Sequence, residues 1–509
     1  MGASKHGRVA KNTLFLYIRQ ILVMVIALYT SRIIIEALGI IEYGVYNVVA
    51  GVSTTFIFFS VSLASSTQRF LNFTMARGDA LELRRVFSQS FWLYVILAAL
   101  VLIVGVSVGY WLVNDILVIP KHLVGRALIV FYLMIISLAL TVVGSVFESV
   151  VISRENMKIY AYMGIFDAVF KLAVAFITFV VPDKLVVYAA LMVVAMLVPK
   201  IILTVYCLRH YPESKPIKVW DKSLIARMLG FTGWNVYGSL VYVFSEQGIN
   251  VALNMMFGPV VNAARGIAMQ VNSATNSLST NFFVALRPQL IKTYAEGDMS
   301  SERSLFSLAS RGSFFLVSCL AIPLIGRMDT VLNLWLGEVP EYSVSFVNWT
   351  LIFITFNALN NPLRAVVHAT GDIRRSAIEG DTIYFMGLPA GIIMLWLGFP
   401  AWTVYPCAIV ARLASNLTFL RIVRRAIGLP GNFYTKEIAL PIFLATIVSC
   451  GWTFCADIIC PSGVLGLIGY GAISFAGCIA ADFFLGISKD ERTNVINRFR
   501  GKFSRFSCQ

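Results

Sequence analysis

The stretch FGPVVNAARGIAMQVNSATNSLSTNF, residues 257–282, carries many hydrogen-bonding side chains for a segment that is long enough to cross a bilayer. Asn262, Arg265, Asn272 and Asn276 recur at steps of three, seven and four, which places them on one face of a helix. A guanidinium group can bind phosphate in bidentate fashion, and amides can bind sugar hydroxyls. This face therefore has the chemistry to bind a polar, negatively charged group.

A second polar stripe lies on the preceding segment, where Glu246, Asn250 and Asn254 follow the same helical spacing. Gln270 adds one more amide to the segment that follows. Such stripes have two interpretations. They can join the two helices to each other, at about 0.6 kcal/mol per pair of polar groups, or they can line a water-filled cavity. Because both stripes run through most of the membrane depth, we expect the cavity.

Further arginines within apolar segments are candidate ligands of the same anion. An arginine at the centre of a lipid-exposed helix costs about 2.5–3.5 kcal/mol on insertion, so these side chains should face protein or water. The candidates are Arg19, Arg32, Arg265 and Arg311. Lys200 and Arg412 instead lie near segment ends and fit side chains that extend to the membrane interface.

Three acidic residues are candidates for coupling transport to protons, to Na⁺ or to another cation: Glu148, Asp167 and Glu246. Each has a structural alternative. Asp167 lies four residues before Lys171, a spacing that also predicts a local ion pair. The other two could equally neutralise a nearby arginine. The four histidines and eight cysteines show no spacing typical of a metal site, so we expect no metal, no cofactor and no catalytic residue.

The composition indicates an integral membrane protein. Of 509 residues, 58% are hydrophobic and 13% are charged, against roughly 25% charged in soluble domains. The net charge of +15 does not indicate nucleic-acid binding, because the basic residues lie in short runs between apolar segments. Apolar runs of spanning length predict an all-α protein with about fourteen transmembrane helices, near 14–36, 44–66, 86–109, 124–150, 158–181, 185–208, 228–256, 260–286, 304–326, 343–367, 380–399, 401–423, 437–456 and 463–485.

The basic residues predict the orientation in the membrane. With the N-terminus inside, most of the 41 basic residues fall in the tails and in alternate loops. The opposite loops hold only Lys121, Arg126, Lys184 and Arg327. Because positive loops stay in the cytoplasm, we expect both termini to be cytoplasmic.

An internal repeat suggests two related halves. SRIIIEALGIIEYGVYNVVAGV (31–52) and NVALNMMFGPVVNAARGIAMQV (250–271) align without a gap, with Gly39 and Gly258 at the same position. Duplicated halves are common in transporters, with the binding site between them. We expect the following organisation: an N-lobe at 1–208, a cytoplasmic linker at 209–224, a C-lobe at 225–425, two additional helices in 426–486 and a basic cytoplasmic tail at 487–509.

Three stretches resemble the bacterial polysaccharide-transport and O-antigen flippases of the multidrug/oligosaccharidyl-lipid/polysaccharide (MOP) exporter superfamily. They are TSRIIIEALGIIEYGVYNVVAG, FGPVVNAARGIAMQVNSATNSLSTNFFVALRPQLIKTYAEGD and NPLRAVVHATGDIRRSAIEG. The resemblance implies two six-helix lobes in a V around a cationic cavity, in the bacterial inner membrane. It also implies a flippase for undecaprenyl-pyrophosphate-linked oligosaccharides that works by alternating access, with Arg19, Arg32 and Arg265 at the pyrophosphate.

Other functions remain as alternatives. A lipid II flippase would carry the same pyrophosphate, and a cation-coupled small-molecule exporter of the same superfamily is a further possibility. A membrane-embedded glycan polymerase or ligase is disfavoured because no outer loop is large enough for an acceptor site, so we expect a transporter and not an enzyme. The expected partners are the lipid-linked oligosaccharide, membrane lipids, a glycan polymerase and other polysaccharide assembly proteins. The energy source is expected to be H⁺, Na⁺ or the membrane potential.

Overall fold

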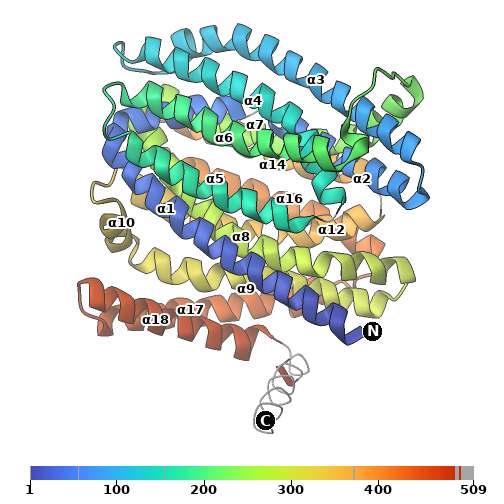
Figure 1. Cartoon of the computed structure of the whole chain (residues 1–509). Helices are drawn as coiled ribbons and strands as arrows, with labels where there is room; N and C mark the ends of the chain where they lie inside the picture. Colours follow the sequence, from blue (N-terminus) through green and yellow to red (C-terminus); the bar gives the residue numbers. More distant parts are fainter. Residues whose placement is uncertain (1, 55–56, 155, 371–372, 488–491, 494–509) are drawn as a thin grey trace, which may run out of the picture. The chain divides into compact units, whose positions relative to one another are not determined.

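The computed structural model describes residues 2–54, 57–154, 156–370, 373–487 and 492–493, and within these parts the chain is helical with short connections (Figure 1). The sequence prediction of an all-α fold is confirmed. The α-helices longer than ten residues in the first half are α1 (Gly2–Thr54), α2 (Ile57–Arg77), α3 (Ala80–Trp111), α4 (Val124–Ser153), α5 (Met157–Ile177), α6 (Lys184–His210) and α7 (Lys222–Phe257).

The second half continues with helices of more varied length. They are α8 (Pro259–Glu296), α9 (Met299–Gly326), α10 (Met328–Leu336), α11 (Ser343–Asn357), α12 (Asn360–Thr370), α13 (Ile373–Arg375), α14 (Thr382–Phe385), α15 (Gly387–Trp396), α16 (Val404–Ala426), α17 (Leu440–Ile459) and α18 (Val464–Ala481). Short π-helical turns extend several of these helices: Leu112–Ile116, Ser376–Asp381, Thr435–Ala439 and Asp482–Gly486.

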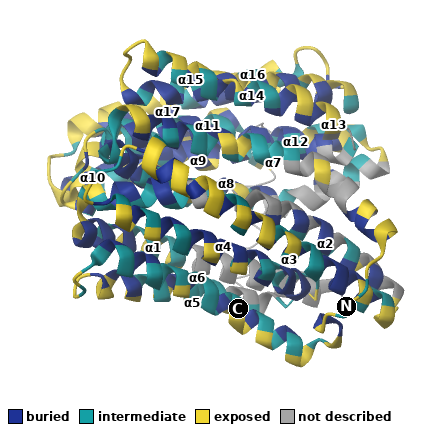
Figure 2. Ribbon diagram, turned by 90° about the horizontal axis from the view of Figure 1, so that it is seen from above, coloured by how far each residue is buried: buried dark blue, intermediate teal, exposed yellow. Residues whose placement is uncertain are grey.

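Membrane-spanning character is evident from length and surface. Nine of the described helices are long and apolar enough to cross a membrane. Large apolar side chains are exposed on α17 and α18, among them Phe454 at 68% and Leu465 at 86%. Figure 2 shows buried and exposed residues on most helices, as expected where one face packs and the other meets lipid. Apolar surface of this extent would make a soluble monomer aggregate, so the chain is a multi-pass membrane protein.

Three expected spans differ from the apolar helices of the structure. The segment expected at 343–367 is two helices, because the chain leaves helical geometry at Ala358 and Leu359. The segments expected at 228–256 and 260–286 lie on α7 and α8 but are not among the nine apolar helices.

Contacts between Cα atoms divide the chain into two compact units. Unit 1 comprises 1–267, 338–343 and 392–401, and unit 2 comprises 268–337, 344–391 and 402–509. The expected N-lobe lies wholly in unit 1, together with α7. The boundary falls inside α8 and not in the expected linker; the lobe boundaries inferred from the sequence remain a prediction.

Each unit has its own apolar core. In unit 1, α3, α4 and α6 run side by side, and Phe87, Tyr94 and Phe147 are buried between α3 and α4 (Figure 1). In unit 2, α9, α12 and α16 bury Phe306 and Phe419. Between membrane helices such aromatic side chains stabilise the fold by close van der Waals packing.

The additional helices expected in 426–486 are present as the α17–α18 hairpin, which packs against α9 within unit 2. The Tyr470 hydroxyl donates to the Pro323 carbonyl oxygen at 2.9 Å. Arg327 Nε donates to Asp457 Oδ1 at 2.6 Å, and the Arg327 guanidinium lies over the Tyr470 ring. The hairpin is therefore attached to α9 by polar as well as apolar contacts.

The two glycines of the internal repeat have the same backbone conformation. Gly39 has φ 77° and ψ 165°, and Gly258 has φ 77° and ψ −173°. Each glycine joins two helical segments. This region of φ and ψ is open almost only to glycine, so the repeat conserves a specific helix–turn–helix geometry.

We expect Gly39→Ala and Gly258→Ala each to lower the free energy of unfolding by about 1–3 kcal/mol, because alanine is strained at this φ and ψ. A Cβ atom at either position would meet nothing within 4 Å, so the cost is conformational and not steric. The control is Gly451→Ala on α17, where a Cβ also meets nothing within 4 Å but φ is not positive. Melting temperatures in detergent measure the effect; equal values for all three variants would contradict it.

Candidate functional site

The polar stripes of the sequence meet at the turn between α7 and α8, in unit 1. Gly258 ends α7, and Pro259 begins α8 at the first helical position, where proline needs no amide donor. The tight turn brings α7 residues next to α8 residues a few turns away along the chain. Asn250 and Asn254 of α7 consequently face Asn262 of α8.

Three asparagines from the two stripes form one buried cluster, which we call the asparagine cluster: Asn250, Asn254 and Asn262. Asn254 Nδ2 donates to Asn262 Oδ1 at 2.8 Å, and Asn262 Nδ2 donates to Asn250 Oδ1 at 2.9 Å. Asn254 Oδ1 also accepts from the Val118 amide at 2.7 Å. Asn254 and Asn262 are fully buried, so in this structure their amides satisfy one another.

Arg265 lies one turn beyond the asparagine cluster and is 5% exposed. Its Nη2 donates to Glu246 Oε2 at 2.9 Å and to the Glu246 carbonyl oxygen at 3.0 Å. A third helix covers the same place: a Cβ atom on Gly51 of α1 would lie 2.6 Å from Gln247 Oε1 and 2.8 Å from Asn250 Nδ2. The polar residues of α7 therefore contact α8 on one side and α1 on another.

This arrangement differs from the expected aqueous cavity at these positions. The amides of the asparagine cluster and the Arg265 guanidinium contact each other's helices, which is the alternative that the sequence left open. The physical reason is that an amide has both donors and an acceptor, so two amide stripes satisfy each other as well as water does. A role for Asn250, Asn262 and Arg265 in cargo binding requires these contacts to open, and it remains a prediction.

The remaining candidate amides lie farther along α8, in unit 2, and are half-buried. Asn272 Nδ2 lies 4.0 Å from the Met269 sulfur. Asn276 Oδ1 is buried and has no hydrogen-bond partner among the described residues. Gln270, two residues before Asn272, is also half-buried. In the described part of the chain, the Asn276 side chain therefore has an unused acceptor, unlike the amides of the asparagine cluster.

The other predicted arginines have different surroundings. Arg19 lies on α1, but its side chain is outside the described part of the chain. Arg32 is half-buried on α1. Arg311 of α9 is 5% exposed, and its Nη1 donates to the Gly486 carbonyl oxygen at 3.0 Å. Arg311 belongs to unit 2, whereas Arg32 and Arg265 belong to unit 1.

Each acidic candidate is paired with a base. Lys200 of α6 donates to the Glu148 carboxylate of α4, and Lys171 Nζ donates to Asp167 Oδ2 at 2.7 Å. Lys200 is thus a partner across two helices and does not extend to the interface as expected. Glu246 holds Arg265. In the part of the chain that the structure describes, no three His, Cys, Asp or Glu side chains gather as a metal site.

Unit 2 contains a second buried charged cluster that the sequence analysis did not identify. Arg364 of α12 donates to the Asp381 carboxylate and, through Nε, to Asn360 Oδ1 at 2.8 Å. Asn360 Nδ2 donates in turn to Asn416 Oδ1 of α16 at 2.8 Å. The pairs 360/364 and 412/416 are each four residues apart, so helical spacing of polar residues was the available signal.

Arg412 completes this second cluster and corrects the expectation that it extends to the interface. Its side chain is only 2% exposed, and its guanidinium lies 3.6 Å from the centroid of the Tyr384 ring. Nε and Nη1 have no hydrogen-bond partner among the described residues. The cluster therefore holds two guanidinium groups and one carboxylate.

Replacing Arg412 by methionine should change the free energy of unfolding by no more than about 1 kcal/mol, or raise it, because a buried charge without full hydrogen bonding contributes little. Replacing Arg364 by methionine should lower it clearly, since Asp381 then loses its hydrogen-bonded partner. Thermal unfolding of the two variants in one detergent tests this order. Equal losses would show that Arg412 is as important to stability as Arg364.

Comparison with known proteins finds solved structures that have a similar fold. No protein-family model and no curated protein matches the sequence. The chain is similar to the lipid II flippase MurJ in an inward closed conformation, with a TM-score of 0.70, 11% identity and coverage of 92% of this chain and 98% of that chain. It is also similar to an inward-facing multidrug resistance MATE family transporter, with a TM-score of 0.68, 12% identity and coverage of 81% and 96%.

A third solved structure agrees with these two. It is a MOP superfamily transporter from Pyrococcus furiosus, with a TM-score of 0.57, 11% identity and coverage of 80% of this chain and 95% of that chain. At such identities the likeness concerns the fold. The chain has the helical fold of the MOP superfamily transporters.

Proposed function

We propose that this protein is a flippase that moves an undecaprenyl-pyrophosphate-linked oligosaccharide from the inner to the outer leaflet of the bacterial inner membrane, by alternating access. We choose a flippase over a small-molecule exporter because the flippase structure covers more of this chain. The MurJ structure covers 92% of this chain and the inward-facing MATE structure covers 81%. The difference is about the length of 435–486, which forms the α17–α18 hairpin.

Physical chemistry supports a polar lining in such a protein. A diphosphate with sugars attached cannot cross hydrocarbon unaided, because each uncompensated polar group costs several kcal/mol there. Arginine replaces the lost hydration of a phosphate with two directed hydrogen bonds. In the proposed function the half-buried Arg32 and the amides of Gln270, Asn272 and Asn276 are the accessible candidates for this role.

Arg265 has a conditional place in the proposal. Its guanidinium is held by the Glu246 carboxylate, which has the same charge as a phosphate oxygen and occupies the same donor. A pyrophosphate that binds Arg265 through Nη2 would have to displace this carboxylate. Glu246 therefore competes with cargo for this donor, and in the proposal its predicted role in ion coupling depends on this competition.

The second candidate is a lipid II flippase, which the similarity to MurJ favours. Complementation distinguishes the two. Strains that lack an O-antigen, capsule or lipid II flippase each depend on a different lipid-linked glycan, and the wild-type chain is expressed in each at matched membrane level. Rescue of an O-antigen or capsule strain supports the proposal. Rescue of the lipid II strain alone favours the second candidate, and rescue of none contradicts both.

A further inference from the structure

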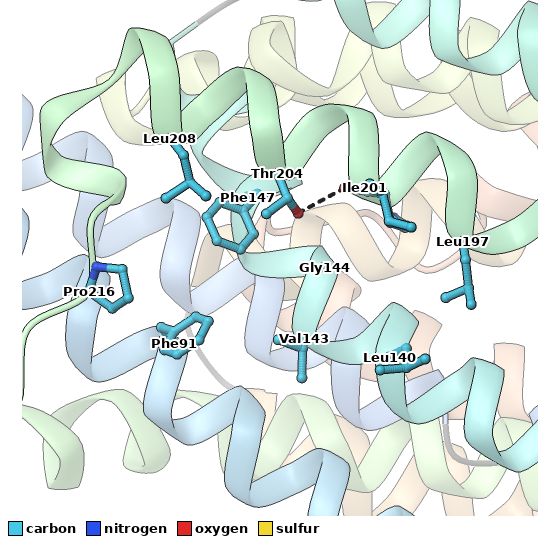
Figure 3. A pocket seen from close by; sticks show the side chains of 11 residues that line it. Phe91, Leu140, Val143, Gly144, Phe147, Leu197, Ile201, Thr204, Leu208 and Pro216 are labelled. Atoms are coloured by element: carbon cyan, nitrogen blue, oxygen red, sulfur yellow. Dashed lines mark hydrogen bonds between the residues drawn. The ribbon is translucent and has the colours of Figure 1, made fainter.

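A cavity of about 430 Å³ lies within unit 1 among α3, α4 and α6, away from the turn between α7 and α8. Lys200 and Thr204 line it, and every other lining residue is apolar. Figure 3 shows Leu208 of α6 beside the same space as Val143 and Phe147 of α4. The volume lies within the range of small-molecule sites, roughly 300–1,000 Å³.

The single charge at the cavity is neutralised. A Cβ atom on Gly144 would lie 2.9 Å from Lys200 Cβ, so the glycine lets the Lys200 stem lie directly against α4. The Lys200 ammonium group then pairs with Glu148, which lies one turn after Gly144 on α4. The cavity thus presents hydrocarbon, and its occupant should be an uncharged chain.

The cavity is open toward the membrane. Leu140 of α4 and Ile201 of α6 both line it and are 51% and 57% exposed. Both helices are among those long and apolar enough to span a bilayer. A molecule can therefore enter sideways from the surrounding lipid.

One end of the cavity carries fixed positive charge. Leu208 and Pro216 line this end, and the neighbouring residues Arg209, Lys215 and Lys218 are exposed. The nearby carboxylate of Glu213 is 7% exposed and already paired with Arg154. It does not neutralise the exposed cations.

The segment with these cations is held in place by α3. Arg84 Nε donates to the Lys215 carbonyl oxygen at 3.0 Å. The Ile217 amide donates to Ser88 Oγ at 3.0 Å, and Trp92 Nε1 donates to the Ile217 carbonyl oxygen at 3.1 Å. The backbone that carries Lys215 and Lys218 consequently has a fixed position beside the cavity.

We propose that this cavity and its basic end bind one anionic phospholipid of the surrounding membrane. One acyl chain occupies the space between α4 and α6, and the phosphate headgroup contacts Lys215 and Lys218. Basic segments beside transmembrane helices attract anionic lipids, and in the orientation that the basic residues predict this end faces the cytoplasmic leaflet. The apolar cavity adds a chain-binding part that a basic surface alone lacks.

Native mass spectrometry of the purified full chain in detergent tests the proposal, with phosphatidylglycerol and phosphatidylcholine of the same acyl chains as probes. Phosphatidylglycerol should bind at one site at least about tenfold more tightly. The double variant Lys215→Gln/Lys218→Gln should lose about tenfold in that affinity. Val143→Phe, which fills the cavity, should lose a similar amount while the lysines remain. Its fold is checked by its melting temperature.

The control removes the same charge elsewhere. Arg424→Gln/Arg425→Gln alters two exposed arginines at the end of α16, in unit 2, and should leave phosphatidylglycerol binding unchanged. Equal affinity for the two lipids would overturn the proposal, as would equal losses in the control and the lysine variant. A normal affinity in a folded Val143→Phe protein would overturn the cavity as the chain-binding site. Inorganic phosphate at the same concentration should not compete.

Discussion

Arg265→Met is expected to lower the free energy of unfolding by about 3 kcal/mol, because it leaves the Glu246 carboxylate, which is only 15% exposed, without the guanidinium that donates to it. Glu246→Gln is expected to be costly for the converse reason, since the guanidinium then lacks a counter-charge. Melting temperatures in detergent measure both losses. A single variant as stable as the wild type would show that the ion pair contributes nothing to the fold.

The double variant Arg265→Met/Glu246→Gln separates stability from transport. It removes both charges, so most of the lost stability should return, and the double-mutant cycle gives the coupling energy between the two side chains. If Arg265 binds the cargo pyrophosphate, the double variant should be well folded and yet fail to rescue glycan export. Full rescue by this variant would remove Arg265 from the cargo site and leave it a structural residue.

Gly44→Ala should be among the most destabilising substitutions in unit 1, with a loss of about 3 kcal/mol or more. A Cβ atom at Gly44 would lie 1.9 Å from the carbonyl oxygen of Pro259, at the start of α8. A backbone atom cannot move aside as the end of a flexible side chain can, so α1 and α8 would have to separate. The loss is measured as a fall in melting temperature and in the folded yield in membranes.

Two other glycines provide the comparison for Gly44→Ala. Gly266→Ala meets the side chain of Asn47 at 2.7 Å and should cost less, because a side chain can shift. Gly125→Ala in the first turn of α4 meets nothing within 4 Å and should be neutral or slightly stabilising, since alanine favours helix. A Gly44→Ala protein as stable as Gly125→Ala would contradict the close approach of α1 and α8.

The sequence predicted the helical class and the internal repeat because both depend on local patterns. Apolar runs of spanning length need no knowledge of neighbours, and Gly39 and Gly258 occupy equivalent places in two aligned segments. The two helices of 426–486 were predicted for the same reason. Each of these features can be recognised within one short stretch of the sequence or by aligning two such stretches.

The surroundings of the polar side chains were harder to predict. Helical spacing shows that Asn262 and Arg265 share a face, but it does not show whether that face meets water or a second polar stripe. Arg412 is a similar case: its proximity to a segment end suggested the interface, whereas the Tyr384 ring from another helix covers it. Such partners are set by tertiary packing, which a single sequence does not specify.

The attachment of residues 215–217 to α3 has a consequence for measuring motion in this protein. A spectroscopic label at Lys215 would report on unit 1, although 209–224 was expected to be the cytoplasmic linker between the two lobes. A label pair meant to follow movement between the units therefore needs its second member after Ile267, for example at an exposed position on α18. Two labels on either side of 209–224 both lie in unit 1, so the distance between them does not report on movement between the units.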